Sequence, residues 1–456
     1  MRSALTLCRL LSIFGPMSTF GPLPPLTRLY RACEPNDPIA PDDPRYVNCD
    51  VVRGDNLPLR YERSLRLSDP LRPEVKVFAG HRGVGKSSEL LRLKDMLECP
   101  NAGEGNPYHV LFTDVTRMLD LNDLDFPDLL VFLAGEVQRQ LRESGIPGFS
   151  AASVQIQTLW DELSGALRSK VSLTGRDVDI PYLPLAVEIK NRPNSRSELR
   201  SAIERQSTSL LEAVNDLLQL ANLKLREAGR EGLVLIVDGL DKMVRRDLDG
   251  GTNTHERLFI RRSEQLASVK SHVIYTVPIS LIYSPQFTQL EQTFGEHNVP
   301  VPMIRLRGED RSDPSPSTPG MVKMREILEK RCDYAGVDFR EVFDSQETCD
   351  HLCEMTGGHP RHLMMFIQSA ASRVDGLPIT REAVERAVRD YSNSLKRSIP
   401  DDFWPHLQRF ETPQVDIPTD SMHQEMLLLL HLFEYMNGRP WYEVNPVLRT
   451  IPRFEE

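Results

Sequence analysis

One short segment, GHRGVGKS at residues 80–87, constrains the fold of this chain more than any other part of the sequence. It fits the pattern GxxxxGK[ST], in which glycines let consecutive backbone N–H groups turn toward an anion. Residues 74–79 (EVKVFA) predict a short strand before the segment, and residues 86–98 predict a helix after it. A strand, a glycine-rich loop and a helix in this order predict a phosphate-binding loop at a helix N-terminus.

The residue types in this loop assign roles toward phosphate and metal groups. Lys86 is expected to reach the β- and γ-phosphates of a nucleotide, and the Ser87 hydroxyl is expected to hold Mg²⁺. The dipole of the following helix favours the anion. The nucleotide-binding candidates in this segment are Gly80, His81, Arg82, Gly83, Val84, Gly85, Lys86, Ser87 and Ser88. The alternative interpretation is an ordinary glycine turn.

A second motif supplies the acids that such a loop needs. Residues 232–238 (GLVLIVD) contain a run of apolar residues that ends in an acid, which is typical of a buried parallel strand. The carboxyl edge of such a sheet is where ligands bind. We therefore expect Asp238 to bind Mg²⁺, directly or through water, and Asp241 to polarise the attacking water. The alternative for Asp241 is a helix N-cap or a surface acid.

Composition excludes several other classes of protein. The 456 residues carry a formal net charge of −10, with 40% hydrophobic and 26% charged residues, which is ordinary for a folded chain of about three domains. The most apolar runs, 232–237 and 426–430, are far shorter than the roughly 20 residues that span a bilayer. The acidic balance also argues against a nucleic-acid coat protein, although it leaves room for a local basic groove.

The cysteines and the N-terminal region indicate in which cellular compartment the protein is expected. Seven scattered cysteines include no CxxC pair, so a reduced, cytoplasmic protein is expected, with Cys349 and Cys353 as buried apolar residues. Residues 1–33 lack Asp and Glu, but Arg9 interrupts their apolar run, so secretion or organelle import is not favoured, and Met17 is an alternative start. The proline-rich arm over 1–50 is expected to wrap a surface or be disordered.

With both motifs in hand, the chain resembles the signal-transducing STAND branch of the AAA+-like P-loop ATPases. That branch has an hhhhDxxD second motif, and here Asp238 and Asp241 fit it, with Gly239 where AAA+ proteins carry glutamate. The loop also resembles a group of bacterial ATP-binding proteins with the pattern GHRGxGKSxEL. The resemblance implies an α/β fold with a parallel sheet in the order 5-1-4-3-2, a helical lid and a C-terminal winged-helix-like domain.

The hydrophobic pattern of the rest of the sequence predicts the individual strands, helices and domains of this fold. Strands two to five are expected at 108–115, 232–238, 271–276 and 300–307, with strand one at 74–79. Helices are expected at 126–143, 196–228, 320–335, 342–356, 359–374 and 380–396, followed by an apolar helix over HQEMLLLLHLFEYM and an Asn-Gly turn at 437–438. The predicted units are an arm (1–50), an ATPase core (51–307), a helical lid (308–399) and a winged-helix-like domain (400–456).

The resemblance also implies three further site residues. Thr276, at the end of the fourth strand, lies where a sensor of the γ-phosphate is found, so the catalytic set is Asp241, Lys86 and Thr276. Residues 356–361 (TGGHPR) resemble the GxP turn that packs near the adenine, which places Pro360 there, and Arg361 resembles a second sensor arginine. The alternatives are capping of the strand end for Thr276 and an exposed arginine at a helix start for Arg361.

These features favour an ATPase that uses ATP and Mg²⁺. The first hypothesis is a slowly hydrolysing switch that acts through conformational change on an unknown protein partner, with a nucleotide-dependent homo-oligomer as a further option. The alternatives are a DNA-associated loader of the origin-recognition or transposition type and a non-hydrolysing scaffold. Acidic residues outnumber basic ones over 401–456, which disfavours DNA as a partner. No membrane partner is expected.

Overall fold

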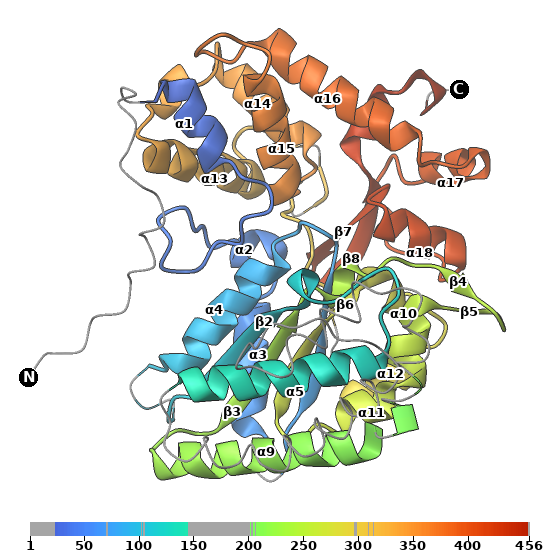
Figure 1. Cartoon of the computed structure of the whole chain (residues 1–456). Helices are drawn as coiled ribbons and strands as arrows, with labels where there is room; N and C mark the ends of the chain where they lie inside the picture. Colours follow the sequence, from blue (N-terminus) through green and yellow to red (C-terminus); the bar gives the residue numbers. More distant parts are fainter. Residues whose placement is uncertain are drawn as a thin grey trace, which may run out of the picture.

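A parallel sheet forms the centre of the lower part of the molecule (Figure 1). The computed structural model describes residues 23–144, 201, 204–205 and 207–454, except 70–71, 102, 104, 296–298, 309 and 313. The four strands are β1 (Val75–Gly80), β2 (His109–Asp114), β3 (Leu233–Asp238) and β6 (His272–Pro278), and their order across the sheet is β1-β6-β3-β2. This order confirms the predicted arrangement of the first four strands.

The fifth predicted strand, 300–307, is reduced to a single parallel bridge between Val301 and Gly80. The segment lies in the expected place beside β1, where the Val301 N–H donates to the Ala79 carbonyl at 2.9 Å. Its flanking residues Pro300 and Pro302 have no N–H to continue a ladder. The prediction of a full strand is therefore wrong, although its position in the sheet order is right.

Helices cover both faces of the sheet because alternate strand residues point to opposite sides. In β3, Leu235 and Val237 pack in the cluster formed with α5 (Phe126–Glu143) and α9 (Ser207–Glu227). Val234 and Ile236 pack in a second cluster with α3 (Leu57–Leu67) and α4 (Lys86–Glu98). This is the α/β fold of a P-loop NTPase, as predicted. The start of the long helix predicted at 196–228, including Ile203, lies largely outside the described residues.

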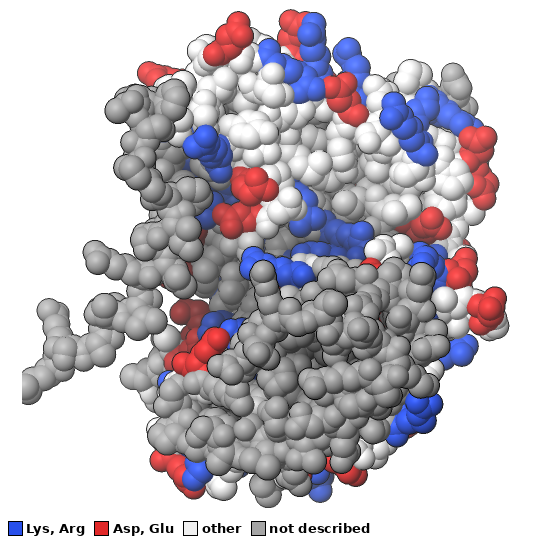
Figure 2. Space-filling view, viewed as in Figure 1, with Lys and Arg blue, Asp and Glu red and all other residues white. Residues whose placement is uncertain are grey.

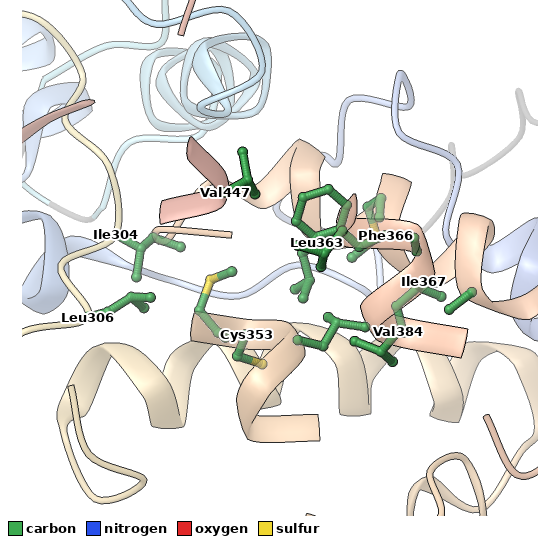
Figure 3. Packing of buried hydrophobic residues seen from close by; sticks show 14 of the residues in the cluster. Ile304, Leu306, Cys353, Leu363, Phe366, Ile367, Val384 and Val447 are labelled. Atoms are coloured by element: carbon green, nitrogen blue, oxygen red, sulfur yellow. The ribbon is translucent and has the colours of Figure 1, made fainter. Parts of the chain in front are cut away.

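The upper part of the molecule is helical. Its helices are α13 (Pro319–Ala335), α14 (Gln346–Met355), α15 (Pro360–Ala371) and α16 (Arg381–Lys396), which confirms the four predicted helices with shifts of a few residues. Figure 3 shows Cys353 among Leu363, Val384 and other apolar side chains of this core. Cys349 and Cys353 are buried, as expected, and neither forms a disulfide. From the arm, α1 (Pro25–Ala32) packs on α13.

Shorter elements complete the described chain. They are α2 (Asp50–Arg53), β4 (Asp247–Leu248), β5 (Thr252–Asn253), α10 (Thr254–Glu256), α11 (Ser263–Ala267), α12 (Phe287–Phe294), α17 (Trp404–Gln408), α18 (Ser421–Leu428), β7 (Leu432–Asn437) and β8 (Arg439–Val444). Across all the residues that the structure describes, every helix is too short or too polar to cross a membrane.

The C-terminal region corrects one prediction. The helix expected over HQEMLLLLHLFEYM ends at Leu428, and its second half is strand β7. Leu430 adopts a left-handed backbone conformation (φ 65°), which breaks the helix although no glycine or proline marks the position. The Asn437–Gly438 turn joins β7 to β8 as predicted, with Gly438 at φ 70°.

The β7–β8 hairpin belongs to two hydrophobic cores. Phe433, Tyr435 and Trp441 pack in the cluster that contains α4 and one face of the sheet. The side chains of Leu432 and Val444 pack instead in the core of the helical part. Figure 1 shows the hairpin where the helical part and the sheet meet. Its alternating side chains therefore tie the two parts together.

The hairpin also carries a buried acid, Glu434, beside the phenolic groups of Tyr283 and Tyr442, whose oxygens are 2.9 Å apart. Burial raises the pKa of Glu434 to about 8, although a hydrogen bond from Tyr283 opposes the shift. Below its ordinary pKa near 4.5, Glu434 is protonated whether the chain is folded or unfolded. Its contribution to stability is therefore complete at low pH and is lost as the pH rises through about 8.

Glu434→Gln is expected to remove this pH dependence because the amide stays neutral. Between pH 6 and 9, the wild type should lose more than about 1.4 kcal/mol of unfolding free energy relative to the variant, the equivalent of one pKa unit. Urea unfolding at both pH values measures the difference, with the exposed Glu382→Gln as the control. Equal pH dependence in Glu434→Gln and wild type would show that Glu434 titrates normally.

Candidate functional site

The loop between β1 and α4 has the backbone that a phosphate-binding loop requires. Gly83 (φ 84°) and Gly85 (φ 106°) both lie in the left-handed region. A Cβ on Gly83 would come within 2.6 Å of Cε1 of His359, so the loop packs tightly against the start of α15. Helix α4 begins at Lys86, directly after the loop. Its free N–H groups and dipole therefore point at whatever occupies the loop.

A cavity of about 580 Å³ opens over this loop. Its volume lies in the usual range for small-molecule sites. It is lined by the loop, the ends of β2 and β3, the start of α15 and the arm segment 34–39. Figure 2 shows Lys and Arg side chains along the hollow between the upper and lower parts of the molecule. The lining cations are Arg82, Lys86, Arg117, Arg139, Lys242, Arg331 and Arg361.

The loop and the second motif meet at the carboxyl edge of the sheet. The Ser87 hydroxyl donates a hydrogen bond to the Asp238 carboxylate at 2.6 Å, and both residues line the cavity. A hydroxyl and a carboxylate are hard oxygen ligands, and Mg²⁺ typically takes one or two of these with phosphate oxygens and water. The pair therefore fits Mg²⁺ held jointly with a nucleotide. The described residues contain no cluster of three or more His, Cys, Asp and Glu that would hold a metal by themselves.

Lys86 and Asp241 form a buried ion pair beside this pair of oxygen ligands. The Lys86 Nζ lies 2.8 Å from the Asp241 carboxylate and also donates to the Gly80 and His81 carbonyl oxygens, both at 2.8 Å. Both side chains are about 95% buried. A phosphate that engages Lys86 must take the place of at least one of these acceptors, because an ammonium has three donors.

The pKa values of the two acids in the second motif, Asp238 and Asp241, are shifted in opposite directions. Burial raises the pKa of Asp238, and the neighbouring charge of Asp241 raises it further. Burial also pushes the pKa of Asp241 upward, but the charge and hydrogen bond of Lys86, together with the charges of Lys242 and Arg82, outweigh burial and hold this pKa below its ordinary value. Asp241 is therefore the carboxyl that stays ionised most firmly, and Asp238 is the one that gains most from a divalent cation. Gly239 is the N-cap of the turn at 240–242, so Asp241 does not cap it.

Thr276 lies behind the site and does not line the cavity. Its side chain is fully buried. The hydroxyl accepts from the Leu240 N–H at 3.0 Å and faces the Val237 carbonyl at 3.3 Å. It thus fixes the turn that carries Asp241, and its assignment as a γ-phosphate sensor stays a prediction.

The turn at 356–361 is at the edge of the cavity. Pro360 opens α15, and Pro360 and Arg361 both line the cavity. The Arg361 Nε donates to the Pro35 carbonyl at 3.3 Å. Burial lowers the pKa of the Arg361 guanidinium, and the negative charge of Asp241 opposes the shift. Arg361 is therefore a cavity residue and is not an exposed arginine at a helix start.

The loop candidates divide into two groups. Arg82, Gly83, Gly85, Lys86, Ser87 and Ser88 line the cavity, whereas Gly80, His81 and Val84 do not. The Ser88 hydroxyl accepts from the Ile39 N–H of the arm at 2.9 Å. The Arg82 guanidinium donates to the Met243 carbonyl at 2.9 Å, beyond the acidic motif. The His81 ring points away from the cavity into the C-terminal region.

Three features of the site are missed by the sequence interpretation. Arg53 is buried and donates to the loop carbonyl of Val84 at 2.6 Å and to the Pro302 carbonyl at 2.9 Å, and no local pattern announces it. Asp114 ends β2 in register with Asp238 and lines the cavity. Its place at the end of a predicted strand was a usable signal. The arm segment 34–39 also lines the cavity, which its proline content alone does not indicate.

Comparisons with known proteins give only distant similarities. No family model and no curated protein matches the chain. A Walker-type ATPase of Pyrococcus abyssi aligns with 14% identity and a TM-score of 0.43, covering 93% of this chain and 100% of that one. The ORC2 protein of Aeropyrum pernix (11%, TM-score 0.39) and Cdc6p from Pyrobaculum aerophilum (12%, 0.39) each cover 93% of this chain and 96% of their own. At this level the similarities carry no functional argument, so function is inferred from the site itself.

Proposed function

We propose that this protein is a Mg²⁺-dependent ATP-binding switch that hydrolyses ATP slowly and acts through conformational change on a protein partner. The observation that carries the proposal is the meeting of Ser87 and Asp238 at 2.6 Å, beneath a cavity closed on one side by the phosphate loop. Phosphoryl chemistry on a nucleotide requires backbone N–H groups that donate to the phosphates, a lysine and two metal ligands. Calorimetric titration with ATP, with and without Mg²⁺, tests it directly.

Each residue has a defined task in this proposal. The loop N–H groups and Lys86 bind the phosphates, while Ser87 and Asp238 hold Mg²⁺, which neutralises charge on the phosphate oxygens. Asp241 is ion-paired with Lys86 when no phosphate is bound. Once a phosphate engages Lys86, the Asp241 carboxylate is released to orient and polarise the attacking water. Hydrolysis then depends on a rearrangement of this pair, which favours a slow reaction.

The switch is proposed to act on the helical and C-terminal parts. We assign 51–307 as the ATPase core, 308–399 as the lid and 400–456 as a winged-helix-like unit, with the arm over 1–50. Arg361 lies in the cavity on the lid side and near the charge of Asp241. A phosphate that contacts Arg361 would favour one position of the lid, and one charge-assisted hydrogen bond, about 1.5–3 kcal/mol, is enough for a typical coupling.

Arg361→Ala is expected to bind ADP within about threefold of wild type but to lose the response of the lid to ATP. Limited proteolysis of the polar, proline-rich segment 308–320, with Pro314 and Pro316, reports that response. In wild type, ATP and ADP should give different cleavage rates there, and in Arg361→Ala the two rates should be equal. Arg373→Ala, an arginine at the far end of the same helical region, is the control. A persisting ATP–ADP difference in Arg361→Ala would refute the coupling.

The output of the switch is proposed to pass through another protein or through further copies of this chain. Size-exclusion chromatography with ATP and with ADP, and capture of partners in each state, test these two options. A DNA-associated loader is the alternative, and the excess of acid over base across 401–456 speaks against it. A non-hydrolysing scaffold is disfavoured by the intact set of Lys86, Ser87, Asp238 and Asp241.

A further inference from the structure

One residue of the phosphate loop has a side chain that the proposed chemistry does not use. The His81 imidazole is fully buried and faces the C-terminal region. Its Nδ1 lies 3.0 Å from the Leu427 carbonyl in the last turn of α18, and its Nε2 accepts from the Glu434 N–H of β7 at 3.0 Å. These partners are 346 and 353 residues away in the chain.

The two partners fix the state of the ring. A backbone N–H can only donate, so Nε2 of His81 carries the lone pair, and Nδ1 carries the hydrogen that is donated to the Leu427 carbonyl. Burial lowers the pKa of His81 to about 3, so the ring is neutral at physiological pH. Each ring nitrogen therefore makes one main-chain hydrogen bond, one to α18 and one to β7.

The backbone of the same residue belongs to the phosphate site. The His81 carbonyl accepts from the Lys86 ammonium at 2.8 Å, as the Gly80 carbonyl does. The next carbonyl, that of Arg82, accepts from Nε2 of His359 at 2.7 Å. A phosphate that engages Lys86 competes for the ammonium with the Gly80 and His81 carbonyls as well as with Asp241, and the His81 ring is attached to that same backbone.

Strand β7, on the far side of the His81 ring from the phosphate loop, contacts the segments that lead to the helical part. Phe433 of β7 stacks edge-on against His81, with ring centroids 6.0 Å apart. The Tyr435 hydroxyl donates to the Gly357 carbonyl at 2.7 Å, and the Met303 N–H donates to the Glu434 carbonyl at 2.9 Å. A shift of β7 therefore reaches the 356–361 turn and the segment that leads to the lid.

We propose that the His81 side chain is a positioning group that couples phosphate binding at the loop to the docking of α18 and the β7–β8 hairpin. This rests on the proposed nucleotide-binding function and names a second route of communication, separate from Arg361. The ring transmits the movement of the loop backbone because its Nε2 accepts directly from the Glu434 N–H of β7. Phosphate binding is thereby read by a part of the chain that has no contact with the phosphate.

Hydrogen exchange on the full chain measures the coupling at its endpoint. The Glu434 amide is the donor to His81, so MgATP is expected to change the exchange rate of peptides covering 427–444 by at least about threefold relative to MgADP. His81→Leu should abolish this difference when MgATP and MgADP are supplied at concentrations that calorimetry shows to saturate the variant. In His81→Gln, the amide oxygen extends to the position of Nε2 and accepts from the Glu434 N–H, so the difference should return.

The matched control is His272→Leu, a second buried histidine that accepts from a main-chain N–H, that of Glu74, at the opposite edge of the sheet. It should leave the ATP–ADP difference at 427–444 intact. If wild type binds MgATP but shows no difference there, or if His81→Leu keeps it, the coupling is refuted while the proposed function stands. If wild type fails to bind MgATP in calorimetry, the proposed function itself fails. Should His81→Leu not fold, the absence of an ATP–ADP difference at 427–444 in wild type would still refute the coupling.

Discussion

Lys86→Ala is expected to lower the affinity for MgATP by about a hundredfold or more, which is the largest effect that we predict for a single substitution. The ammonium is the group at the loop that reaches the β- and γ-phosphates, and two charge-assisted hydrogen bonds, each about 1.5–3 kcal/mol, correspond to two or more factors of ten. Calorimetric titration with MgATP gives the ratio. An unchanged affinity would contradict the assignment of 80–87 as the phosphate site.

The substitution has a side effect that the experiment must separate from binding. In the structure, Lys86 is the ion-pair partner of the buried Asp241, and removing one member of a buried pair leaves an uncompensated charge. The double variant Lys86→Ala with Asp241→Asn removes both charges and should regain stability without regaining affinity. Lys94→Ala, on the same helix but paired with Glu98 away from the cavity, is the control for helix substitution.

Asp241→Asn is expected to keep MgATP binding but to slow hydrolysis by about a hundredfold, a typical effect for the loss of a general base. The asparagine no longer holds Lys86 as an ion-pair partner, so phosphate binding has one competitor fewer and affinity should not fall. Measurements of phosphate release and of binding separate the two effects. If Asp241→Asn releases phosphate at the wild-type rate, Asp241 has no catalytic role.

Asp238→Asn should show the opposite pattern and so serves as the matched variant. Its carboxylate, bonded to Ser87, is the proposed metal ligand, and the amide that replaces it has no charge to attract a cation. The dependence of ATP affinity on Mg²⁺ should therefore weaken sharply, while affinity in the absence of Mg²⁺ stays close to that of wild type. Retention of the full Mg²⁺ dependence would remove Asp238 from the metal site.

The sequence predicted the parts of the fold that depend on local pattern. The apolar run ending at Asp238 and the loop at 80–87 became β3 and the β1–α4 connection, since period and glycine positions decide such elements locally. The prediction of a full strand at 300–307 failed because two prolines there cannot continue the hydrogen-bond ladder. The prediction of a helix through Leu430 failed because the following residues pair as a strand, although helix propensity alone would continue the helix.

For the candidate site, the sequence named Lys86, Ser87, Asp238 and Asp241, which the structure brings together at one cavity. It could not place side chains whose partners are distant in the chain. Arg53 reaches the loop from α2, and the His81 ring bonds residues 346 and 353 positions later. Thr276 illustrates the converse, since it lies two residues before the end of β6 and its hydroxyl is taken up by the turn at Leu240. Such partners are decided by tertiary packing, which periodicity does not encode.

The sharing of the hairpin between two cores also sets an order of assembly on the ribosome. The sheet cluster around Phe78 and Leu90 is incomplete without Phe433 and Trp441, which are translated long after the loop. The 353 residues that separate His81 from Glu434 take about 20–70 s to synthesise at typical elongation rates. For that interval the phosphate loop exists on a nascent chain whose sheet cluster lacks the side chains of the hairpin. The nucleotide site therefore matures only when the hairpin has been made, and a chain truncated before residue 432 is expected to need chaperones rather than to yield an independent ATPase core.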